Sequence, residues 1–389
     1  MTQTLRIGVI GGGLMGKEVC SAFARWCHLS VGPIQPVVTA ICARTAETRA
    51  WFTQRVPTIT VETADYRQVL ASPEVDVVYC AVPHDLHREM YVATISADKH
   101  LLGEKPFGID REANAAIAAA AAQHPELVVR CSSEFPFYPG AQRIVRYAQE
   151  ERFGTILEVE AGLLHSSDLD PLKPLNWKRE IASNGEYGCM GDLGMHVLHL
   201  PLRLGWRPRR VHAILSNIVR ERPGPNGTML PCQTWDNAML LCDVAQNDAA
   251  FPMTLKAQRI APGEVNTWYL TVKGTQLSVH FSTKHPRTLL TMPYTRGEAQ
   301  AWRQEDLGSH SVYPSITGAI FEFGFSDAIL QMLAAFFDQV GHGPEAEVPF
   351  GCATVEETRL HHEVLTAALA SHAAGQVVAL PEDEGRSDR

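Results

Sequence analysis

The chain has 389 residues, 45% of them hydrophobic and 20% charged, and its formal net charge is −9. This length predicts about two domains, and the composition is typical of a soluble globular protein with a substantial core. The acidic balance excludes a global positive field that would recruit nucleic acid or a membrane surface.

The cysteines and the apolar runs of the sequence indicate in which cellular compartment the protein is found. Nine cysteines are present and none forms a C-x-x-C pair, so we expect reduced thiols with no disulfide framework and no zinc site. No signal-peptide pattern precedes the first apolar run, and the alanine run 115–122 is too short to span a bilayer. We therefore expect a cytoplasmic protein.

The first third of the chain alternates short β-branched runs with longer helical patterns. This alternation predicts βαβ units and a doubly wound parallel sheet over residues 1–130. Two of the runs are continuously apolar, as expected of strands that helices cover on both faces. The expected strands are 6–10, 37–42, 75–81 and 100–102, and the expected helices are 18–26, 46–54, 86–97 and 109–123.

The pattern of apolar and polar residues changes after residue 130. An aromatic and proline-rich stretch, 132–140, reads as a loop, and alternating strands follow it. They predict an α/β domain over 131–380 with a large, mostly antiparallel open sheet, and the tail 381–389 reads as disordered. The expected strands are 156–164, 211–220, 237–244, 251–260, 268–272 and 276–281, and the expected helices are 192–204, 327–339 and 355–374.

A glycine-rich turn follows the first strand and precedes a helix. Gly11, Gly13 and Gly16 fit G-x-G-x-x-G, with Leu14 and Met15 between the last two. The spacing suits a tight turn, a close approach of the backbone to a pyrophosphate, and close packing of helix on strand. The alternative is a plain glycine-rich turn. The order strand, turn, helix favours a Rossmann dinucleotide site that uses these five residues.

The second strand ends where a ribose-reading acid is expected for NAD. Here Ala43 and Arg44 stand instead. Because arginine can pair with a 2′-phosphate, we favour NADP over NAD as cofactor. In the alternative, Arg44 is a solvated surface residue and Glu47 or a water reads the ribose.

Polar residues follow the third and fourth strands. Ligands of doubly wound sheets bind beyond the carboxyl ends of the strands, so these residues should lie on the cofactor side. Lys105 could donate to a substrate hydroxyl there. The alternative for a lone Glu-Lys-Pro is a solvent-facing turn. We predict cofactor contacts from Ala81, Pro83, His84, His87, Glu104 and Lys105.

Three of these segments resemble a known family. Residues 8–16, residues 76–84 with His87, and Gly-Glu-Lys-Pro at 103–106 look like the Gfo/Idh/MocA oxidoreductases. In that family the lysine of Glu-Lys-Pro is catalytic, which the resemblance transfers to Lys105. The resemblance covers nearly the whole chain, and in the family the open sheet often forms a homodimer or homotetramer contact.

Residues 191–196 resemble the family's D-x-G-x-H helix start. Asp192 and His196 are four apart, so both side chains project from one face of a helix. Histidine titrates near neutral pH and can take the proton of a hydroxyl, while Asp192 can hold His196 or Lys105 in place. The alternative is an aspartate helix cap and a packed histidine, as we expect for His199 and His212.

The predicted substrate pocket departs from common family patterns. Pro136 stands where members often carry arginine before the phenylalanine that matches Phe137. We expect Phe137, Tyr138, Trp177 and Lys178 to bind substrate. Residues 165–170 read H-x-x-D-x-D, a weak metal pattern, and we expect no metal site.

The resemblance implies reversible hydride transfer between nicotinamide and a secondary alcohol or ketone of a sugar, polyol or glycoside. One alternative is a reductase of a non-sugar carbonyl or diol, or a redox-assisted glycoside cleavage with internal cofactor recycling. Another is a non-catalytic nucleotide-sensing regulator. Intact Lys105, Asp192 and His196 favour an enzyme, because a sensor does not need proton-transfer groups.

Overall fold

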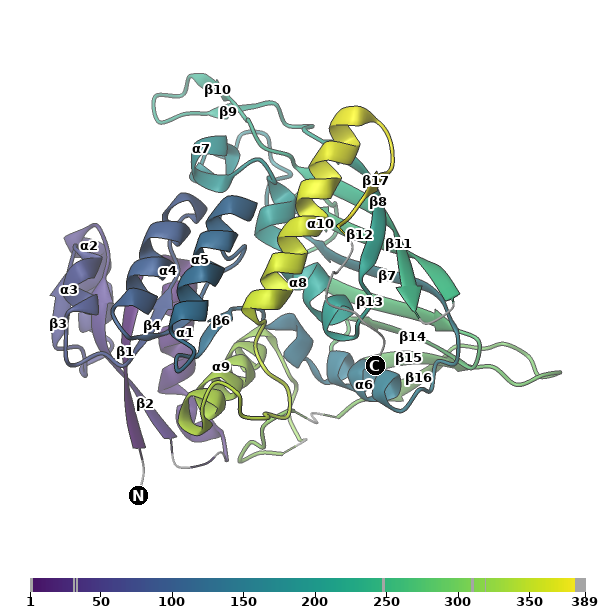
Figure 1. Cartoon of the computed structure of the whole chain (residues 1–389), viewed down its shortest axis with the longest axis horizontal. Helices are drawn as coiled ribbons and strands as arrows, with labels where there is room; N and C mark the ends of the chain where they lie inside the picture. The colour runs from purple at the N-terminus through teal and green to yellow at the C-terminus, as the bar shows by residue number, and fades with distance from the viewer. Residues whose placement is uncertain are drawn as a thin grey trace. The chain divides into compact units, whose positions relative to one another are not determined.

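The computed structural model describes residues 3–30, 32, 34–246, 249–308, 311–318 and 320–381. From residue 382 on, the predicted tail lies outside the described residues. Two compact units are present: Met1–Gln142 with Gly308–Thr358, and Arg143–Leu307 with Arg359–Arg389 (Figure 1). The first unit therefore takes in a late segment, 308–358, instead of ending near residue 130.

The first unit is built on a six-stranded parallel sheet in the order β3-β2-β1-β4-β5-β6, which confirms the doubly wound fold. Parallel neighbours need crossover connections, and the helices between the strands supply them. The strands are β1 (Gln3–Ile10), β2 (Ile34–Cys42), β3 (Val61–Thr63), β4 (Val77–Cys80), β5 (His100–Gly103) and β6 (Val129–Cys131). The helices are α1 (Leu14–Ala24), α2 (Ala46–Thr53), α3 (Tyr66–Leu70), α4 (His87–Ser96) and α5 (Arg111–Gln123).

Helix α9 (Phe325–His342) explains why the late segment joins the first unit. Its largely buried length packs against α1 and β2. Phe337 meets Phe23 and Trp26 of the N-terminal region edge-on, at ring distances of 5.6 and 5.7 Å. The burial of these aromatic rings stabilises the attachment of residues 308–358 to the sheet layer.

The stretch predicted as a loop at 132–140 is more regular than expected. A 3-10 turn spans Phe135–Phe137, and helix α6 (Pro139–Gln149) begins directly after it. Proline is favourable in the first turn of a helix, where its missing N–H has no intrahelical partner. Pro139, which indicated a loop in the sequence, is therefore the first residue of a helix in the structure.

The second unit is built on a nine-stranded sheet in the order β16-β15-β14-β13-β7-β12-β11-β8-β17. Strands β7 and β12 run parallel, and the other neighbours pair antiparallel, as the predicted open sheet requires. A separate ribbon pairs β9 (Glu221–Pro223) with β10 (Met229–Pro231). The sheet strands are β7 (Ile156–Leu164), β8 (Pro208–Ser216), β11 (Asn237–Gln246), β12 (Ala249–Gln258), β13 (Thr267–Gly274), β14 (Leu277–Ser282), β15 (Thr288–Pro293), β16 (Arg303–Asp306) and β17 (Val378–Ala379).

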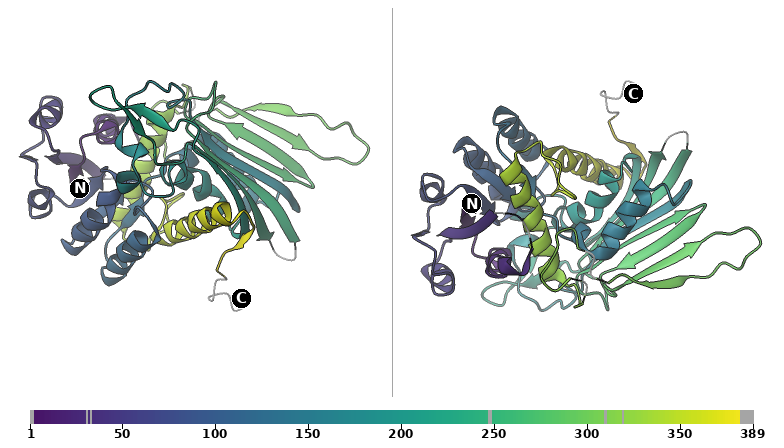
Figure 2. Two further views of the ribbon diagram at one scale, coloured as in Figure 1. Left: turned by 90° about the horizontal axis from the view of Figure 1, so that it is seen from above. Right: turned by 90° about the horizontal axis from the view of Figure 1, so that it is seen from below.

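One face of this sheet is covered and the other is open (Figure 2). Helix α8 (Cys189–Arg203) packs on β7, β11 and β12, and the later part of α10 (Val355–Ala374) reaches β8 through Ser371. Strand side chains alternate between faces, so the covered face is apolar. The open face carries the side chains of Ile214, Met239 and Leu241, which are 60%, 45% and 54% exposed.

Among the described residues, no helix combines the length and the apolar character needed to cross a membrane. None of the nine cysteines, all of them within the described ranges, forms a disulfide.

Candidate active site

The glycine turn has the backbone contacts that a phosphate-binding turn needs. Gly11 has φ +107° and donates its N–H to the Cys42 carbonyl at 2.9 Å. A Cβ at Gly11 would collide with the Ala81 carbonyl, and a Cβ at Gly16 would collide with the Gly11 carbonyl. At Gly13, by contrast, an added Cβ would meet nothing within 4 Å. The turn is therefore closed towards the sheet and open at Gly13.

The start of α1 borders this open side. Gly13 is its N-cap residue, and no side chain caps the helix. Leu14 is 82% exposed, and Met15 is half-buried. Uncapped N–H groups and the positive end of the helix dipole favour an anion here. The turn thus fits the pyrophosphate of a dinucleotide.

The loop after β2 is held by an arginine that sequence reasoning missed. Arg49 donates to the carbonyls of Ala43 and Arg44 at 2.8 and 3.2 Å and pairs with Glu62 at 3.2 Å. Ala43 is buried, whereas the Arg44 side chain is exposed and contacts no charged group among the described residues. Arg49 thus fixes the loop backbone and leaves the Arg44 guanidinium available. Only its position in α2, the helix that follows this loop, could have indicated this role.

The two histidines after β4 are more buried than their predicted role suggests. His84 is 3% exposed and His87 is fully buried. The His87 ring stacks on Tyr91 with centroids 4.7 Å apart, and its Nε2 lies 3.0 Å from the Val82 carbonyl. The structure gives His87 a packing role, and its contact with a cofactor stays a prediction. Ala81 and Pro83 are half-buried at the strand end.

Glu104 is anchored by tyrosine hydroxyls from neighbouring elements. Tyr79 on β4 donates to Glu104 Oε1 at 2.7 Å, and Tyr91 on α4 donates to the Glu104 carbonyl at 2.8 Å. Burial, with the charge of Glu104 as a second cause, raises the pKa of Glu134 to about 8. Lys105, half-buried, opposes this rise. The Glu-Lys-Pro segment is thus part of a buried polar cluster and not a solvent-facing turn.

In the second unit, Asp192 and His196 lie on α8 and are 5% and 4% exposed. Gly188 is the N-cap residue of this helix, so Asp192 is not the cap. Both Asp192 carboxylate oxygens accept from Lys178 Nζ at 3.0 Å, and Arg259 Nη2 lies 2.8 Å from Oδ2. Arg259 was missed because an arginine after a strand belongs to no motif.

The predicted substrate residues fall into two groups. Trp177 and Lys178 form a 3-10 turn in the second unit, with Lys178 Nζ 5.6 Å from the Trp177 ring centre and its side chain 37% exposed. Phe137 and Tyr138 are buried in the first unit, where their rings meet Phe350 and Phe323. These two are packing residues in the structure, and their contact with substrate stays a prediction.

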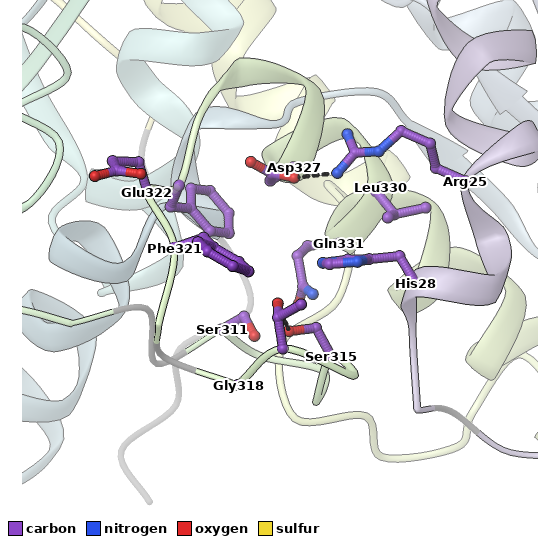
Figure 3. A pocket seen from close by; sticks show the side chains of 12 residues that line it. Arg25, His28, Ser311, Ser315, Gly318, Phe321, Glu322, Asp327, Leu330 and Gln331 are labelled. Atoms are coloured by element: carbon purple, nitrogen blue, oxygen red, sulfur yellow. Dashed lines mark hydrogen bonds and ion pairs between the residues drawn. The ribbon is translucent and has the colours of Figure 1, made fainter.

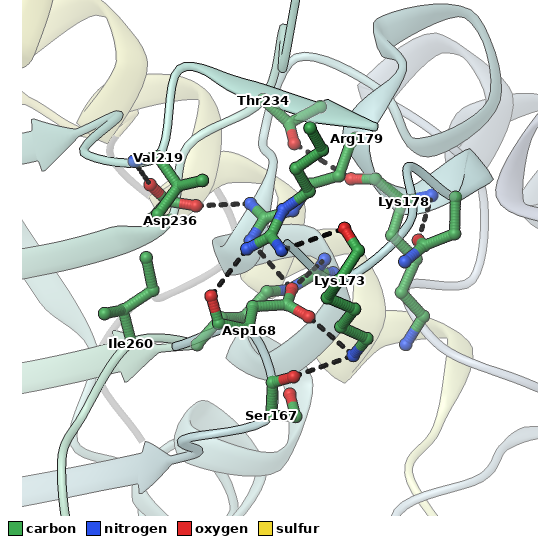
Figure 4. A network of polar contacts seen from close by, with 12 residues as sticks. Ser167, Asp168, Lys173, Lys178, Arg179, Val219, Thr234, Asp236 and Ile260 are labelled. Carbon is green, nitrogen blue, oxygen red and sulfur yellow. Dashed lines mark hydrogen bonds and ion pairs between the residues drawn. The ribbon is translucent and has the colours of Figure 1, made fainter. Parts of the chain in front are cut away.

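Asp168, the first aspartate of the H-x-x-D-x-D pattern, faces the side chains of a lysine and an arginine. Asp168 accepts from Lys173 Nζ and from Arg179 Nη2, both at 2.7 Å (Figure 4). Such partners oppose the binding of a metal ion at this carboxylate.

A cavity of about 250 Å³ lies elsewhere in the first unit (Figure 3). Arg25, His28, Asp327 and Gln331 are among its lining residues, and Arg25 pairs with Asp327 at 2.5 Å. No predicted site residue lines it. The candidate site is therefore defined by its side chains and not by this cavity. Lys105 belongs to the first unit and Asp192 and His196 to the second, so their assembly into one site is part of the proposal below.

Comparison with known proteins identifies the family to which both units of the chain are similar. One family model, described as an oxidoreductase family with an NAD-binding Rossmann fold, matches residues 5–130, and the GFO/IDH/MocA C-terminal domain matches residues 141–280. Levoglucosan dehydrogenase of Pseudarthrobacter phenanthrenivorans is 28% identical over 294 residues, 72% of this chain and 74% of that protein. The NADP(+)-dependent scyllo-inositol 2-dehydrogenase IolU of Bacillus subtilis is 28% identical over 181 residues, 45% of this chain and 53% of that protein. A structure of levoglucosan dehydrogenase with NADH and L-sorbose superimposes with a TM-score of 0.87 and 24% identity, covering 98% of this chain and 100% of that chain.

Proposed function

Because the chain belongs to the GFO/IDH/MocA oxidoreductases, we propose that it interconverts a secondary alcohol and a ketone of a sugar, polyol or glycoside. The observation that carries this proposal is the pair Asp192 and His196, nearly buried on one helix, with Lys178 bound to Asp192. The relatives named dehydrogenases of levoglucosan and of inositols support the substrate class. The matched family model is described as an NAD-binding Rossmann fold, which supports a nicotinamide cofactor.

In the proposed mechanism, His196 takes the hydroxyl proton of the substrate and Lys105 donates a hydrogen bond to the same oxygen. The bound nicotinamide supplies the hydride acceptor, or in the reverse direction the donor. Asp192 holds Lys178, and Trp177 beside it offers an apolar face to the sugar ring. The glycine turn and the start of α1 would hold the pyrophosphate.

The test is a screen of sugars, polyols and glycosides with NAD and NADP, followed by nicotinamide absorbance and by product analysis. Once a substrate is found, His196→Asn and Lys105→Met should each lower kcat by roughly 10²–10⁴-fold. His199→Asn, on the same helix, is the matched control and should have a much smaller effect. Wild-type turnover in His196→Asn or Lys105→Met contradicts the mechanism, and product formed without net cofactor change contradicts simple dehydrogenation.

We further propose a preference for NADP over NAD. The exposed Arg44 guanidinium, on a backbone fixed by Arg49, supports it, because such a group can pair with a 2′-phosphate. Arg44→Ala should lower kcat/KM with NADP about tenfold and leave kcat/KM with NAD nearly unchanged. Glu47→Ala is the control variant, because Glu47 reads the ribose only in the alternative to this proposal. An NAD preference that survives Arg44→Ala contradicts the proposal.

We also propose a cytoplasmic homodimer or homotetramer that associates through the open face of the nine-stranded sheet. Ile214, Met239 and Leu241 expose apolar side chains there, and the absence of disulfides among the nine thiols suits a reducing compartment. Light scattering should give a mass above that of one chain, and Leu241→Glu should lower it. A monomeric wild type contradicts this assembly.

A further inference from the structure

A row of buried charged side chains leads away from Asp192 through the interior of the second unit. Arg259 lies between two carboxylates, with Nη2 2.8 Å from Asp192 Oδ2 and Nη1 3.8 Å from Asp168 Oδ2. Arg179 continues the row, since it donates to Asp168 at 2.7 Å and also pairs with Asp236 (Figure 4). None of the five residues is more than 5% exposed.

We propose that Arg259 and Asp168 are positioning residues for the reaction, which set the charge around Asp192 and thereby the basicity of His196. This inference rests on the proposed function, in which His196 is the general base. It assigns a role to two residues that do not touch the reacting atoms and that belong to none of the family motifs in the sequence.

The geometry indicates that Arg259 acts through its charge. Its guanidinium is 2.8 Å from the Asp192 carboxylate, yet no N–H of Arg259 is aligned for a hydrogen bond with any described acceptor. Asp168 shares the same guanidinium from the other side. Because water is excluded from this region, charge interactions over such distances are only weakly screened. Removing either partner should therefore change the potential at Asp192.

Asp236, the last residue of the row, is held by hydrogen bonds from backbone amides. Asp236 accepts from the amides of Ile218 and Val219 at 2.7 and 2.8 Å. Arg222, fully buried, donates to the carbonyls of Asp168 and Asp170 at 2.5 and 2.6 Å. The loop that carries Asp168 is thus held from two sides, so Asp168 can act as a fixed counter-charge to Arg259.

Two other titratable groups near the start of α8 have shifted pKa values. Burial raises the pKa of Cys189 to about 12, and burial with the nearby His362 lowers the pKa of His361 on α10. His361 faces α8 at Gly194, midway between Asp192 and His196. The charged and titratable groups of the second unit near this part of α8 are Cys189 on α8 itself, Lys178 on the 3-10 turn, His361 on α10 with His362 beside it, and Arg259, Asp168, Arg179 and Asp236 of the buried row. His199 and Arg203, which contact each other, lie farther along α8.

The experiment measures the acid limb of kcat/KM against pH, which reports the pKa of the base in the free enzyme. In Arg259→Gln a cation is lost, protonated His196 is stabilised, and the limb should move up by roughly 0.5–1 pH unit. In Asp168→Asn an anion is lost, Arg259 is less neutralised, and the limb should move down by a smaller amount. Arg259→Lys keeps the charge and should restore the wild-type limb.

These opposite shifts separate positioning from a structural role, because misfolding would lower activity without moving the limb in a direction set by charge. Arg210→Gln, which removes a cation from the surface pair with Asp243, is the control and should leave the limb in place. Shifts in the same direction, or no shift in either variant, overturn the inference. If His196→Asn keeps the wild-type limb, the proposed function itself fails, whatever the other variants do.

Discussion

Two buried carboxyl groups, one in each unit, are stabilised in different ways. Glu104 is 6% exposed, and its carboxyl group accepts from the hydroxyl of Tyr79. Asp192 is 5% exposed, and its carboxylate faces the ammonium of Lys178 and the guanidinium of Arg259. A buried carboxyl group needs partners in both cases: the hydrogen bond to the Glu104 carboxyl group comes from a neutral hydroxyl, whereas Asp192 faces two full positive charges.

The difference follows from how each set of partners is brought together. Strand β4 pairs in parallel with β5, so Tyr79 and Glu104 meet through the register of adjacent strands. The partners of Asp192 come from separate loops, at positions 178 and 259, and meet only when the second unit is complete. Local pairing therefore suffices for a hydrogen bond from a neutral donor, whereas the ionic row depends on the whole tertiary structure.

The strongest test of this comparison removes one cation from the ionic row. Arg179→Met leaves Asp168 and Asp236 without their shared guanidinium, and the free energy of unfolding should fall by about 3–5 kcal/mol. Urea denaturation measures it. The matched control, Arg210→Met, breaks an exposed pair with Asp243 and should cost less than about 1 kcal/mol. Equal losses would show that burial does not strengthen the pairs in the row.

A smaller effect is expected in the first unit. Tyr79→Phe removes the buried hydrogen bond to the Glu104 carboxyl group, which should cost about 1.5–3 kcal/mol. Tyr91→Phe removes a bond to the Glu104 carbonyl and should cost about 0.5–1.5 kcal/mol. Both are measured by urea denaturation at neutral pH. A loss in Tyr79→Phe no larger than in Tyr91→Phe would contradict the expected difference between the two hydrogen bonds.

The raised pKa of Glu134 predicts that the stability of the folded protein decreases as the pH rises. Its pKa in the folded protein is raised from 4.5 to about 8, so between these values the folded state holds a proton that the unfolded state has released. Stability should therefore decrease as pH rises from about 5 to 8, on the order of 1 kcal/mol per pH unit. Glu134→Gln should remove this slope, as seen in the melting temperature across the range. An equal slope in wild type and variant contradicts the raised pKa.

The smallest effect on stability is expected at the glycine turn. Gly13→Ala adds a Cβ where nothing lies within 4 Å, at an ordinary φ of −73°, so the unfolding free energy should change by less than about 0.5 kcal/mol. The same Cβ enters the space assigned to the pyrophosphate, and cofactor affinity should fall about tenfold or more. Fluorescence titration with NADPH measures the affinity. Unchanged affinity would argue against pyrophosphate binding at this turn.

Much of the fold was predictable because its signals are local. Continuous apolar runs indicated the buried strands β1 and β4, and alternation indicated the open sheet of the second unit. Hydrophobic periodicity needs only neighbouring residues to be read, and so does a glycine requirement at Gly11 or Gly16. The start of α1 was placed too late, at residue 18 instead of Leu14, because glycine inside a helix weakens the pattern.

The sequence by itself therefore determined the two sheet types, the glycine turn, and the helix that carries Asp192 and His196. Tertiary structure alone decided that residues 308–358 join the first unit, and that Phe137 and Tyr138 are buried. It also decided which cations face Asp192. Arg259 and Asp168 are distant in sequence, and a charge that follows a strand carries no periodic signal. The physical reason is that a buried ion pair depends on where two loops end in space, which no local pattern records.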